Sequence, residues 1–349
     1  MKALIVITGR GLGGDAVIAL NLIKALEDKG IICEIALDDS APGLLFKKKG
    51  YSWYKIKIPQ AGGHAATKIT TIKAAFKMLK SIFQVRKIIK KNDIDFVVGV
   101  IGGGAIVGCV GAKLAKIPSV GVISTPLDSK ICSKLNHCIA LPETSFFRQN
   151  TIPDNITKSY FPINPLINQG NKDKALEKLI KEGNFDKNKK TILFSSGSSL
   201  FKGMVQGISN FSKINQDYNL VLIGIPLKEE YLDLINEKII NLGYIDWLSD
   251  LFDYIDLAVL TDDGLTLQEA IACEVPAIAL TRVKYNRYHN MEGIFKGAVI
   301  ETDLDQLNDT IINCMDNLDQ IHEKSKSYSK DILSAKENIA NIILNEVKK

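Results

Sequence analysis

Residues 261–290, TDDGLTLQEAIACEVPAIALTRVKYNRYHN, decide how the rest of the chain is interpreted. An apolar run at 257–260 precedes them, and the pattern predicts a buried strand, a polar turn, a helix carrying Glu269 near its start, and another buried strand. In parallel α/β sheets, ligands bind where strands end and helices begin. We therefore interpret the stretch as a candidate nucleotide pocket, in which Glu269 accepts hydrogen bonds from a ribose diol. The alternative makes Asp262 a helix N-cap and Glu269 a solvated surface charge.

Bulk composition is that of a globular protein with more than one domain. The chain has 349 residues, of which 46% are hydrophobic and 24% charged, and a net charge of +5 permits an anionic partner without singling out nucleic acid. Met1 and Lys2 lead straight into an apolar run, so we expect no signal peptide. The six cysteines form no CxxC pair and the four histidines are far apart, which favours reduced thiols over a zinc site.

Apolar runs alternate with helical spacing and predict two doubly wound parallel sheets, an α/β architecture. The strands expected first are 3–7, 31–37, 96–100, 119–123 and 138–140; those of the second series are 191–194, 220–223, a short strand and turn at 244–247, 257–260 and 275–280. The uncharged run 96–112 contains six glycines, so a strand, turn and helix are favoured over a membrane span.

A rigid Pro-containing connection around Pro162 and Pro165 suggests the domain boundary. We expect one Rossmann-like domain at 1–163, a second at 164–328, and a C-terminal helix at 329–349 that packs back toward the first domain. Two Rossmann-like domains facing a cleft form the GT-B architecture.

A two-domain NAD-dependent dehydrogenase is the rival interpretation. Gly9, Gly11 and Gly14 form a GxGxxG between a strand and a helix, and Asp38 ends the second strand, where an acid takes ribose hydroxyls. The dehydrogenase interpretation assigns no function to the serine-rich turn at 195–199 or to residues 261–290.

Six motifs occur in an order that suggests a different family. They are Gly11-Leu12-Gly13-Gly14, Asp95 to Gly99 with Gly102-Gly103-Gly104, Ser195-Ser196-Gly197-Ser198, Tyr244-Ile245-Asp246, Leu265 to Glu269 through Pro276-Ala277, and Arg287-Tyr288-His289-Asn290. Over nearly its full length the chain thereby resembles the MurG family of glycosyltransferases (family 28), which add N-acetylglucosamine to a lipid-linked cell-wall precursor. The first three motifs look like that family's glycine loops, and the others like its donor-binding segments.

The resemblance implies an inverting, metal-independent enzyme without a cofactor, which transfers a sugar, with GlcNAc favoured, from a UDP-sugar to a lipid-linked acceptor. The donor-binding residues that it implies are Gly13, Gly14, Ser195, Ser196, Gly197, Ser198, Tyr244, Ile245, Asp263, Gly264, Leu265, Thr266, Glu269, Arg287 and Asn290. It makes 1–163 the acceptor-side domain, which contains Gly102, Gly103 and Gly104, and 164–328 the nucleotide-sugar donor domain. It also implies a cytoplasmic protein, peripheral on the inner face of the membrane.

Departures from the family fall mainly on the acceptor side. Asp15 stands where bacterial members carry histidine, residues 120–125 lack their His-Glu-Gln-Asn, and an arginine expected after Pro165 is absent. Asp263 replaces a glycine of the donor turn. We expect a divergent, archaeal member with a different acceptor, for which a pseudomurein-type precursor would fit.

Asp15 is the hypothetical catalytic base, because the attacking hydroxyl must lose a proton. Its alternative role is to cap the helix that begins at Ala16. A UDP-sugar epimerase of related fold, the dehydrogenase and a non-catalytic nucleotide-sugar binder remain the other functional hypotheses.

A basic helix expected from Thr67 to Lys91 bears on membrane association. It has eight Lys and Arg residues and no acidic residue, which suits anionic headgroups. We expect its apolar stripe, Ile69, Ile72, Phe76, Leu79 and Phe83, to pack on the sheet. No aromatic residues are interleaved as base-stacking platforms, so nucleic acid is not an expected partner.

Overall fold

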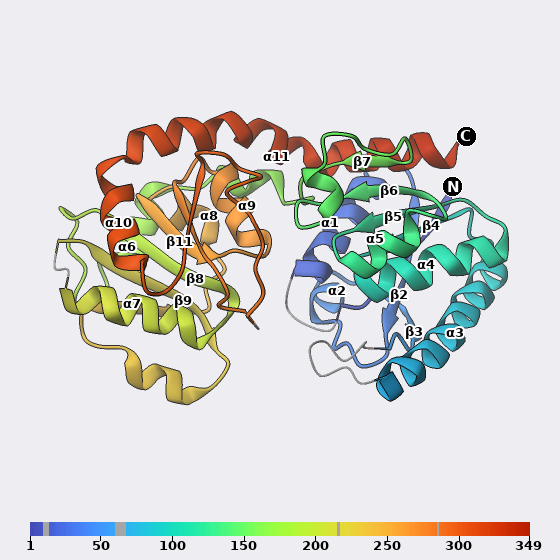
Figure 1. Cartoon of the computed structure of the whole chain (residues 1–349), viewed down its shortest axis with the longest axis horizontal. Helices are drawn as coiled ribbons and strands as arrows, with labels where there is room; N and C mark the ends of the chain where they lie inside the picture. Colours follow the sequence, from blue (N-terminus) through green and yellow to red (C-terminus); the bar gives the residue numbers. More distant parts are fainter. Residues whose placement is uncertain (10–13, 60–67, 215–216, 285) are drawn as a thin grey trace. The chain divides into compact units, whose positions relative to one another are not determined.

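The computed structural model of the chain divides into two compact units (Figure 1). The first comprises Met1–Pro162 and Ala335–Lys349, and the second Ile163–Ser334. The structure describes all residues except 10–13, 60–67, 215–216 and 285, and for residues 68–75 it describes the backbone alone.

The first unit is built on a seven-stranded parallel sheet in the order β3-β2-β1-β4-β5-β6-β7. Its strands are β1 (Lys2–Ile7), β2 (Ile32–Asp38), β3 (Tyr54–Ile56), β4 (Phe96–Val100), β5 (Ser119–Ile123), β6 (His137–Ala140) and β7 (Ile156–Lys158). Its helices are α1 (Gly14–Glu27), α2 (Leu44–Lys48), α3 (Lys68–Lys91), α4 (Gly102–Ala115) and α5 (Pro126–Cys132). The central strands β1 and β4 are apolar and buried, as helix-covered parallel strands must be. The chain order reverses between them, so ligands are expected beyond their carboxyl ends.

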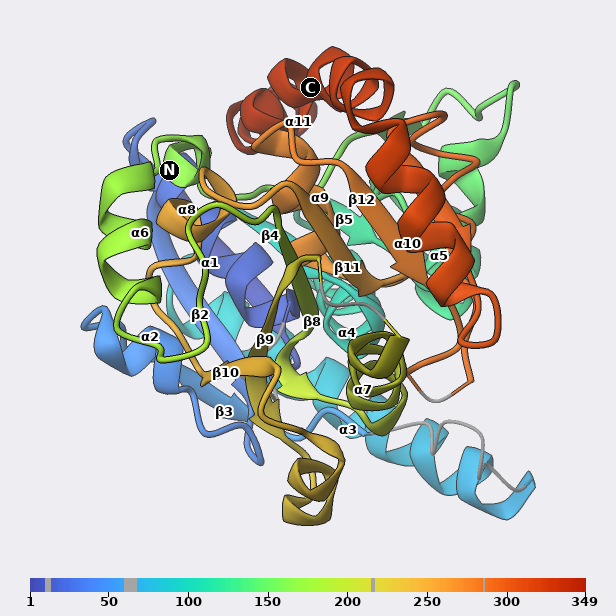
Figure 2. The same cartoon turned by 90° about the vertical axis from the view of Figure 1, so that its left-hand side faces the viewer.

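The second unit repeats this plan with six parallel strands in the order β10-β9-β8-β11-β12-β13 (Figure 2). These are β8 (Thr191–Leu200), β9 (Asn219–Pro226), β10 (Ile239–Gly243), β11 (Leu257–Thr261), β12 (Ala277–Leu280) and β13 (Val299–Thr302). Its helices are α6 (Lys172–Leu179), α7 (Lys202–Ile214), α8 (Leu248–Phe252), α9 (Leu265–Ala272) and α10 (Leu307–Asp316). The switch point lies between β8 and β11. The two sheets together confirm the predicted fold class, a pair of Rossmann-like domains of GT-B type.

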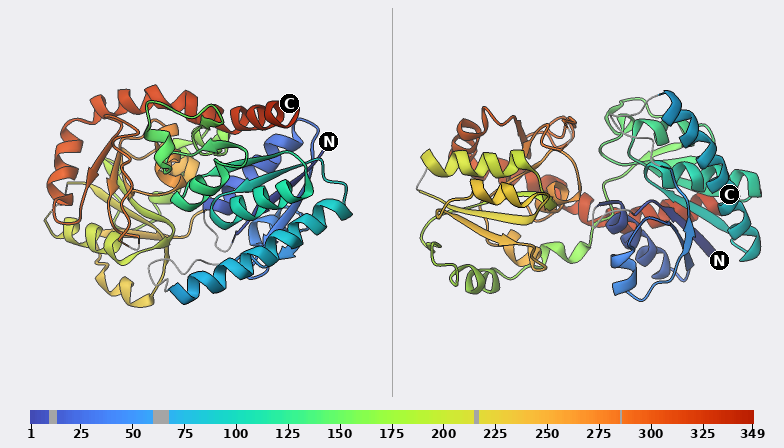
Figure 3. Two further views of the ribbon diagram at one scale, coloured as in Figure 1. Left: turned by 45° about the vertical axis from the view of Figure 1, so that its right-hand side comes forward. Right: turned by 90° about the horizontal axis from the view of Figure 1, so that it is seen from below.

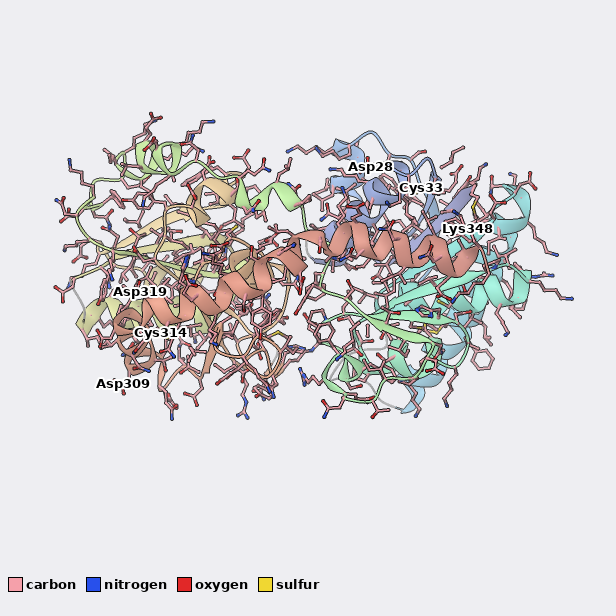
Figure 4. The ribbon with its side chains drawn as sticks, turned by 90° about the horizontal axis from the view of Figure 1, so that it is seen from above. Asp28, Cys33, Asp309, Cys314, Asp319 and Lys348 are labelled. Carbon is pink, nitrogen blue, oxygen red and sulfur yellow. The ribbon has the colours of Figure 1, made fainter. Side chains whose placement is uncertain are left out.

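Helix α11 (Leu318–Val347) is shared by the two units, with residues up to Ser334 in the second and from Ala335 in the first. Figure 4 shows Cys314 and Asp319 near its beginning and Asp28, Cys33 and Lys348 near its end. In the first unit, Lys29 pairs with Glu337 and Lys336 with Asp28, both at 3.6 Å. Ile339 and Ile343 are fully buried, so this part of α11 belongs to the first unit's core.

Three local expectations were wrong. Tyr244 to Trp247 form the loop after β10 instead of a strand, because the strand's apolar start, Ile239 and Ile240, lies earlier. Strand β8 continues through the serine-rich segment, since Ser199 and Leu200 pair again with β9. Helix α11 begins eleven residues before the expected 329, and its early polar residues are those facing solvent.

Candidate functional site: the carboxyl edges of the two sheets

The predicted donor residues of the second unit gather at one edge of its sheet. The serine-rich segment ends β8, Tyr244 follows β10, and Asp262 follows β11. All these strands run parallel, so their carboxyl ends share an edge, and the segments after β8 and β11 meet at the switch point. Residues scattered over about a hundred positions of sequence are thus brought together by topology.

The serine-rich segment departs from the regular ladder. Pairing with β9 shifts between Ser195 and Ser199, as in a bulge, and Gly197 has φ of +90°. The Ser196 hydroxyl donates to the Ser199 carbonyl (2.9 Å) and accepts from the Phe201 amide (3.0 Å). The buried Ser195 and Ser196 therefore shape the segment, while Gly197 and Ser198 form its accessible part.

A small open space lies between this segment and the start of α9. Methyl groups built on Gly197 and on Gly264 would each come within 3.9 Å of the Lys284 ammonium, and that on Gly197 within 4.0 Å of the Thr266 hydroxyl. Apart from neighbours in the chain, no other described atom lies within 4 Å of either position. Gly264 is the N-cap of α9, with φ of +100°, and no side chain caps the helix. The arrangement offers a helix N-terminus, a hydroxyl and an ammonium to an anion.

Glu269 lies on α9 and is half-buried. Burial raises the pKa of its carboxyl to about 7. Within the described part of the chain, its carboxylate has no hydrogen-bond partner, in contrast to a solvated surface charge or a structural carboxylate. Such a group has unused acceptor capacity for a ligand that brings hydroxyl donors.

Asp262 does not cap a helix. Its side chain is 1% exposed, and its Oδ2 accepts a hydrogen bond from the His289 amide at 2.8 Å. Burial raises the pKa of Asp262 to about 6. The carboxylate ties the segment after β12 to the end of β11, which positions His289 at the same edge.

Asp263 forms an ion pair with Lys284, its Oδ1 lying 2.9 Å from the ammonium. Both side chains are about four-fifths buried, and the ammonium also lies 5.9 Å from the centre of the Phe201 ring. Sequence reasoning missed Lys284, although a charge replacing a glycine at position 263 signalled that an opposite charge was needed nearby.

The remaining predicted donor residues lie around this edge with different degrees of exposure. Tyr244 is 63% exposed and Ile245 half-buried in the loop after β10. Arg287 is exposed, and Leu265 and Asn290 are half-buried. The Asn290 side chain accepts a hydrogen bond from the Gly293 amide at 2.6 Å, which gives it a structural task as well.

At the first unit's carboxyl edge, Asp15 lies in the first turn of α1 and is not its N-cap. Its Oδ2 accepts hydrogen bonds from the Thr8 hydroxyl (2.8 Å) and the Gly9 amide (2.9 Å). These bonds fix the chain where it leaves β1. Gly14 begins α1, whereas Gly11 and Gly13 lie outside the described residues.

The glycine triplet after β4 forms the first turn of α4. The Gly102 amide donates to the buried Asp128 at 2.5 Å, and burial raises the pKa of that carboxyl. A methyl group on Gly103 would lie 2.6 Å from Ile58, and one on Gly104 would lie 2.8 Å from the Ile7 backbone. The triplet thus allows α4 to pack closely on β1.

Asp38 does not present its carboxylate as the dehydrogenase interpretation requires. It is 2% exposed and accepts hydrogen bonds from the Ile58 amide (2.8 Å) and the Ser40 hydroxyl. Beside it, Asp39, Lys57, Lys77 and Lys80 border a cavity of about 540 Å³.

Helix α3 carries an exposed apolar stripe, contrary to the expectation that the stripe packs on the sheet. Phe76, Leu79 and Phe83 are 71%, 52% and 58% exposed, and Lys77 and Lys80 are exposed between them. A neighbouring face of the helix packs on the core of the unit, through Ile82, Val85 and Ile89. Ile69 and Ile72 are outside the residues whose side chains are described. Both views of Figure 3 show α3, in cyan-blue, along the margin of its unit.

All six cysteines are free thiols. The described residues contain no group of three or more His, Cys, Asp and Glu side chains arranged to hold a metal ion. Nor does any described helix combine the length and apolar character that crossing a bilayer requires.

Comparison with protein families gives two matches. Residues 5–121 match the glycosyltransferase family 28 N-terminal domain, and residues 176–331 match the glycosyl transferases group 1 domain.

Two curated relatives carry the name UDP-N-acetylglucosamine--N-acetylmuramyl-(pentapeptide) pyrophosphoryl-undecaprenol N-acetylglucosamine transferase. That of Clostridium botulinum is 27% identical over 97% of this chain and 94% of its own length. That of Clostridium tetani is 28% identical over 64% of this chain, and the match spans 62% of the relative, less than two thirds.

Solved structures share the fold over the whole chain. MurG of Acinetobacter baumannii has a TM-score of 0.69 at 18% identity, covering 99% of both chains. UDP-GlcNAc 2-epimerase from Neisseria meningitidis, bound to UDP-GlcNAc, has a TM-score of 0.66 at 15% identity, covering all of both.

Proposed function

We propose that this chain, which is a MurG-like glycosyltransferase of GT-B fold, transfers GlcNAc from UDP-GlcNAc to a lipid-linked, cell-wall-type acceptor. One observation carries the donor half of the proposal. At the switch point of the second sheet, Glu269 lies on the helix whose N-terminus borders the open space at Gly197 and Gly264, and its carboxylate has no hydrogen-bond partner among the described residues. A nucleoside diphosphate needs both features, an acceptor for its ribose diol and donors for its phosphates.

In the proposed reaction, the acceptor hydroxyl attacks the anomeric carbon of GlcNAc. The new C–O bond forms as the bond to the diphosphate breaks, so configuration inverts, UDP leaves, and the hydroxyl proton passes to a base. Asp15 is our proposed base. The first amides of α9, with the Thr266 hydroxyl, would meet the negative charge that develops on UDP. The main chain at Tyr244 and Ile245 would contact the uracil.

Nucleotide binding provides the first test. We expect UDP and UDP-GlcNAc to raise the melting temperature, and NAD, ADP and GDP to leave it unchanged. Stabilisation by NAD and not by UDP would overturn the proposal in favour of a dehydrogenase.

Product analysis separates transfer from epimerisation, the activity named for one structural relative. With a lipid-linked acceptor present, we expect radiolabel from UDP-[14C]GlcNAc to enter the lipid fraction. A change of the sugar to its 2-epimer in the absence of any acceptor would instead support an epimerase.

We also propose that α3 binds the anionic surface of the membrane, at the cytoplasmic face. Phe76, Leu79 and Phe83 are exposed on a helix with no acidic residue, and lysines lie between them. Apolar side chains that enter the headgroup region and lysines that pair with phosphates are the two components of interfacial binding.

Vesicle flotation tests this surface. We expect binding to phosphatidylglycerol vesicles to exceed binding to phosphatidylcholine vesicles and to weaken with salt. Replacing Phe76, Leu79 and Phe83 by serine should lower the binding by about tenfold or more. Ile214→Ser, which changes an apolar side chain that is 62% exposed on α7, serves as the control. Equal partitioning onto both vesicle types would contradict the proposal.

A further inference from the structure

The ion pair between Asp263 and Lys284 has a geometry that stability alone does not explain. Its two residues leave different loops, after β11 and after β12, and both side chains are largely buried. Removing two charges from water costs free energy that their attraction roughly offsets, so such a pair contributes little net stability.

The position of the ammonium is unfavourable without an anion. Lys284 reaches the start of α9, where the helix dipole places partial positive charge. A cation is disfavoured at that end of a helix, whereas an anion is favoured. Asp263 supplies the missing negative charge, at 2.9 Å from the ammonium.

The space beside the pair is open at the two glycines that border it. The Lys284 ammonium lies beside two glycines of positive φ, Gly197 and Gly264. Because glycine has no side chain, the space next to the ammonium stays open. The Thr266 hydroxyl borders the same space. A helix N-terminus, a hydroxyl and an ammonium therefore lie near one position, a set that suits the oxygens of a diphosphate.

This inference rests on the proposed function. We infer that Lys284 is an additional binding residue for the diphosphate of the donor, and that Asp263 forms an ion pair with Lys284 while the site is empty. Binding of the diphosphate transfers the ammonium from the Asp263 carboxylate to the phosphate oxygens. After UDP leaves, the carboxylate takes the ammonium back, which limits the affinity for the product.

Calorimetry with UDP and uridine tests the inference, since uridine lacks the diphosphate. We expect Lys284→Met to weaken UDP binding by about tenfold or more and to leave uridine binding unchanged. Lys284→Arg, which keeps the charge, should retain UDP affinity within about threefold. Asp263→Asn should strengthen UDP binding by about threefold or more, because it removes the competitor for the ammonium.

Lys324→Met is the matched control. The Lys324 side chain lies against Gly297, before the start of β13 and thus at the opposite edge of the same sheet. It should bind UDP as the wild type does. If Lys284→Met binds UDP like this control, or if Lys284→Arg loses as much affinity as Lys284→Met, the inference fails and the proposed function stands. Weaker UDP binding by Asp263→Asn would contradict the competition. If the wild type binds neither UDP nor uridine, both proposals fail.

Discussion

The carboxyl edges of the two sheets share the same topology, but the carboxylates at the two edges differ in their hydrogen-bond partners. In the first unit, Asp15, Asp38 and Asp128 each accept a hydrogen bond from a backbone amide of the loops they brace. In the second, Asp262 also accepts from a backbone amide, but Glu269 has no partner among the described residues, and Asp263 is held by Lys284. A carboxylate bound to its own backbone maintains a loop, whereas one without such a bond has capacity for a ligand. We therefore expect substitutions at the two edges to have different consequences.

The strongest challenge to this contrast is Asp15, a loop-bracing residue that we also propose as the base. Asp15→Asn keeps an oxygen that can accept from the Thr8 hydroxyl or the Gly9 amide, but it cannot take a proton. We expect kcat to fall by at least about a hundredfold while the affinity for UDP is unchanged. Asp15→Ala, which removes the brace as well, should in addition lower the melting temperature. Wild-type turnover in Asp15→Asn would leave Asp15 with its structural role alone.

Glu269 should behave in the opposite way, with a loss of binding and no loss of stability. Glu269→Gln should weaken uridine binding by about tenfold, because the neutral amide is a poorer acceptor for the diol. Since burial raises the pKa of Glu269 to about 7, wild-type uridine affinity should decline as the pH falls below 7. In Glu269→Gln this decline should disappear, as calorimetry between pH 5.5 and pH 8 would reveal.

The same raised pKa has a consequence for stability. A carboxyl whose pKa is higher in the folded state stabilises that state fully below its ordinary value, and this contribution is lost as the pH rises through 7. The melting temperature of Glu269→Gln, relative to that of the wild type, should therefore increase as the pH rises from 5 to 8. A lower melting temperature at pH 8 would show that the carboxylate is structural after all.

Asp38 should show the smallest effect. Asp38→Asn keeps an acceptor for the Ile58 amide and removes a buried charge, so we expect a loss of stability of about 1 kcal/mol or less. Its affinity for UDP should equal that of the wild type, as should its failure to bind NAD. A large loss of nucleotide affinity would mean that the first unit binds the ribose, as in the dehydrogenase interpretation.

Alternation of apolar runs with glycine and serine turns was sufficient to predict both sheets, because central parallel strands read as continuous hydrophobic segments. It was insufficient for α11 and for the loop at Tyr244. There the boundaries depend on which polar residues face solvent, and that is decided by tertiary packing. The apolar stripe on α3 was wrongly predicted to be buried for a related reason. Two apolar faces lie next to each other on that helix, and only the packing of Ile82 and Val85 identifies the buried one.

Candidate donor residues were predictable because topology places loop residues after parallel strands at one edge. Their partners were not. No pattern in the sequence indicates that Lys284 reaches Asp263 across 21 positions, or that Asp38 and Asp128 bind backbone amides. The roles proposed for Asp15, for the glycine triplet and for the donor residues stay predictions until these variants are measured.

The sharing of α11 between the two units has a consequence for the synthesis of the chain. The second unit uses no residue beyond Ser334, but the first needs Ala335–Lys349, although its other residues are made earliest. Until these last residues are made, the surfaces that Ile339 and Ile343 cover stay open, and Lys29 and Asp28 have no partners on α11. The unit whose residues are mostly synthesised first therefore depends on the residues that are synthesised last.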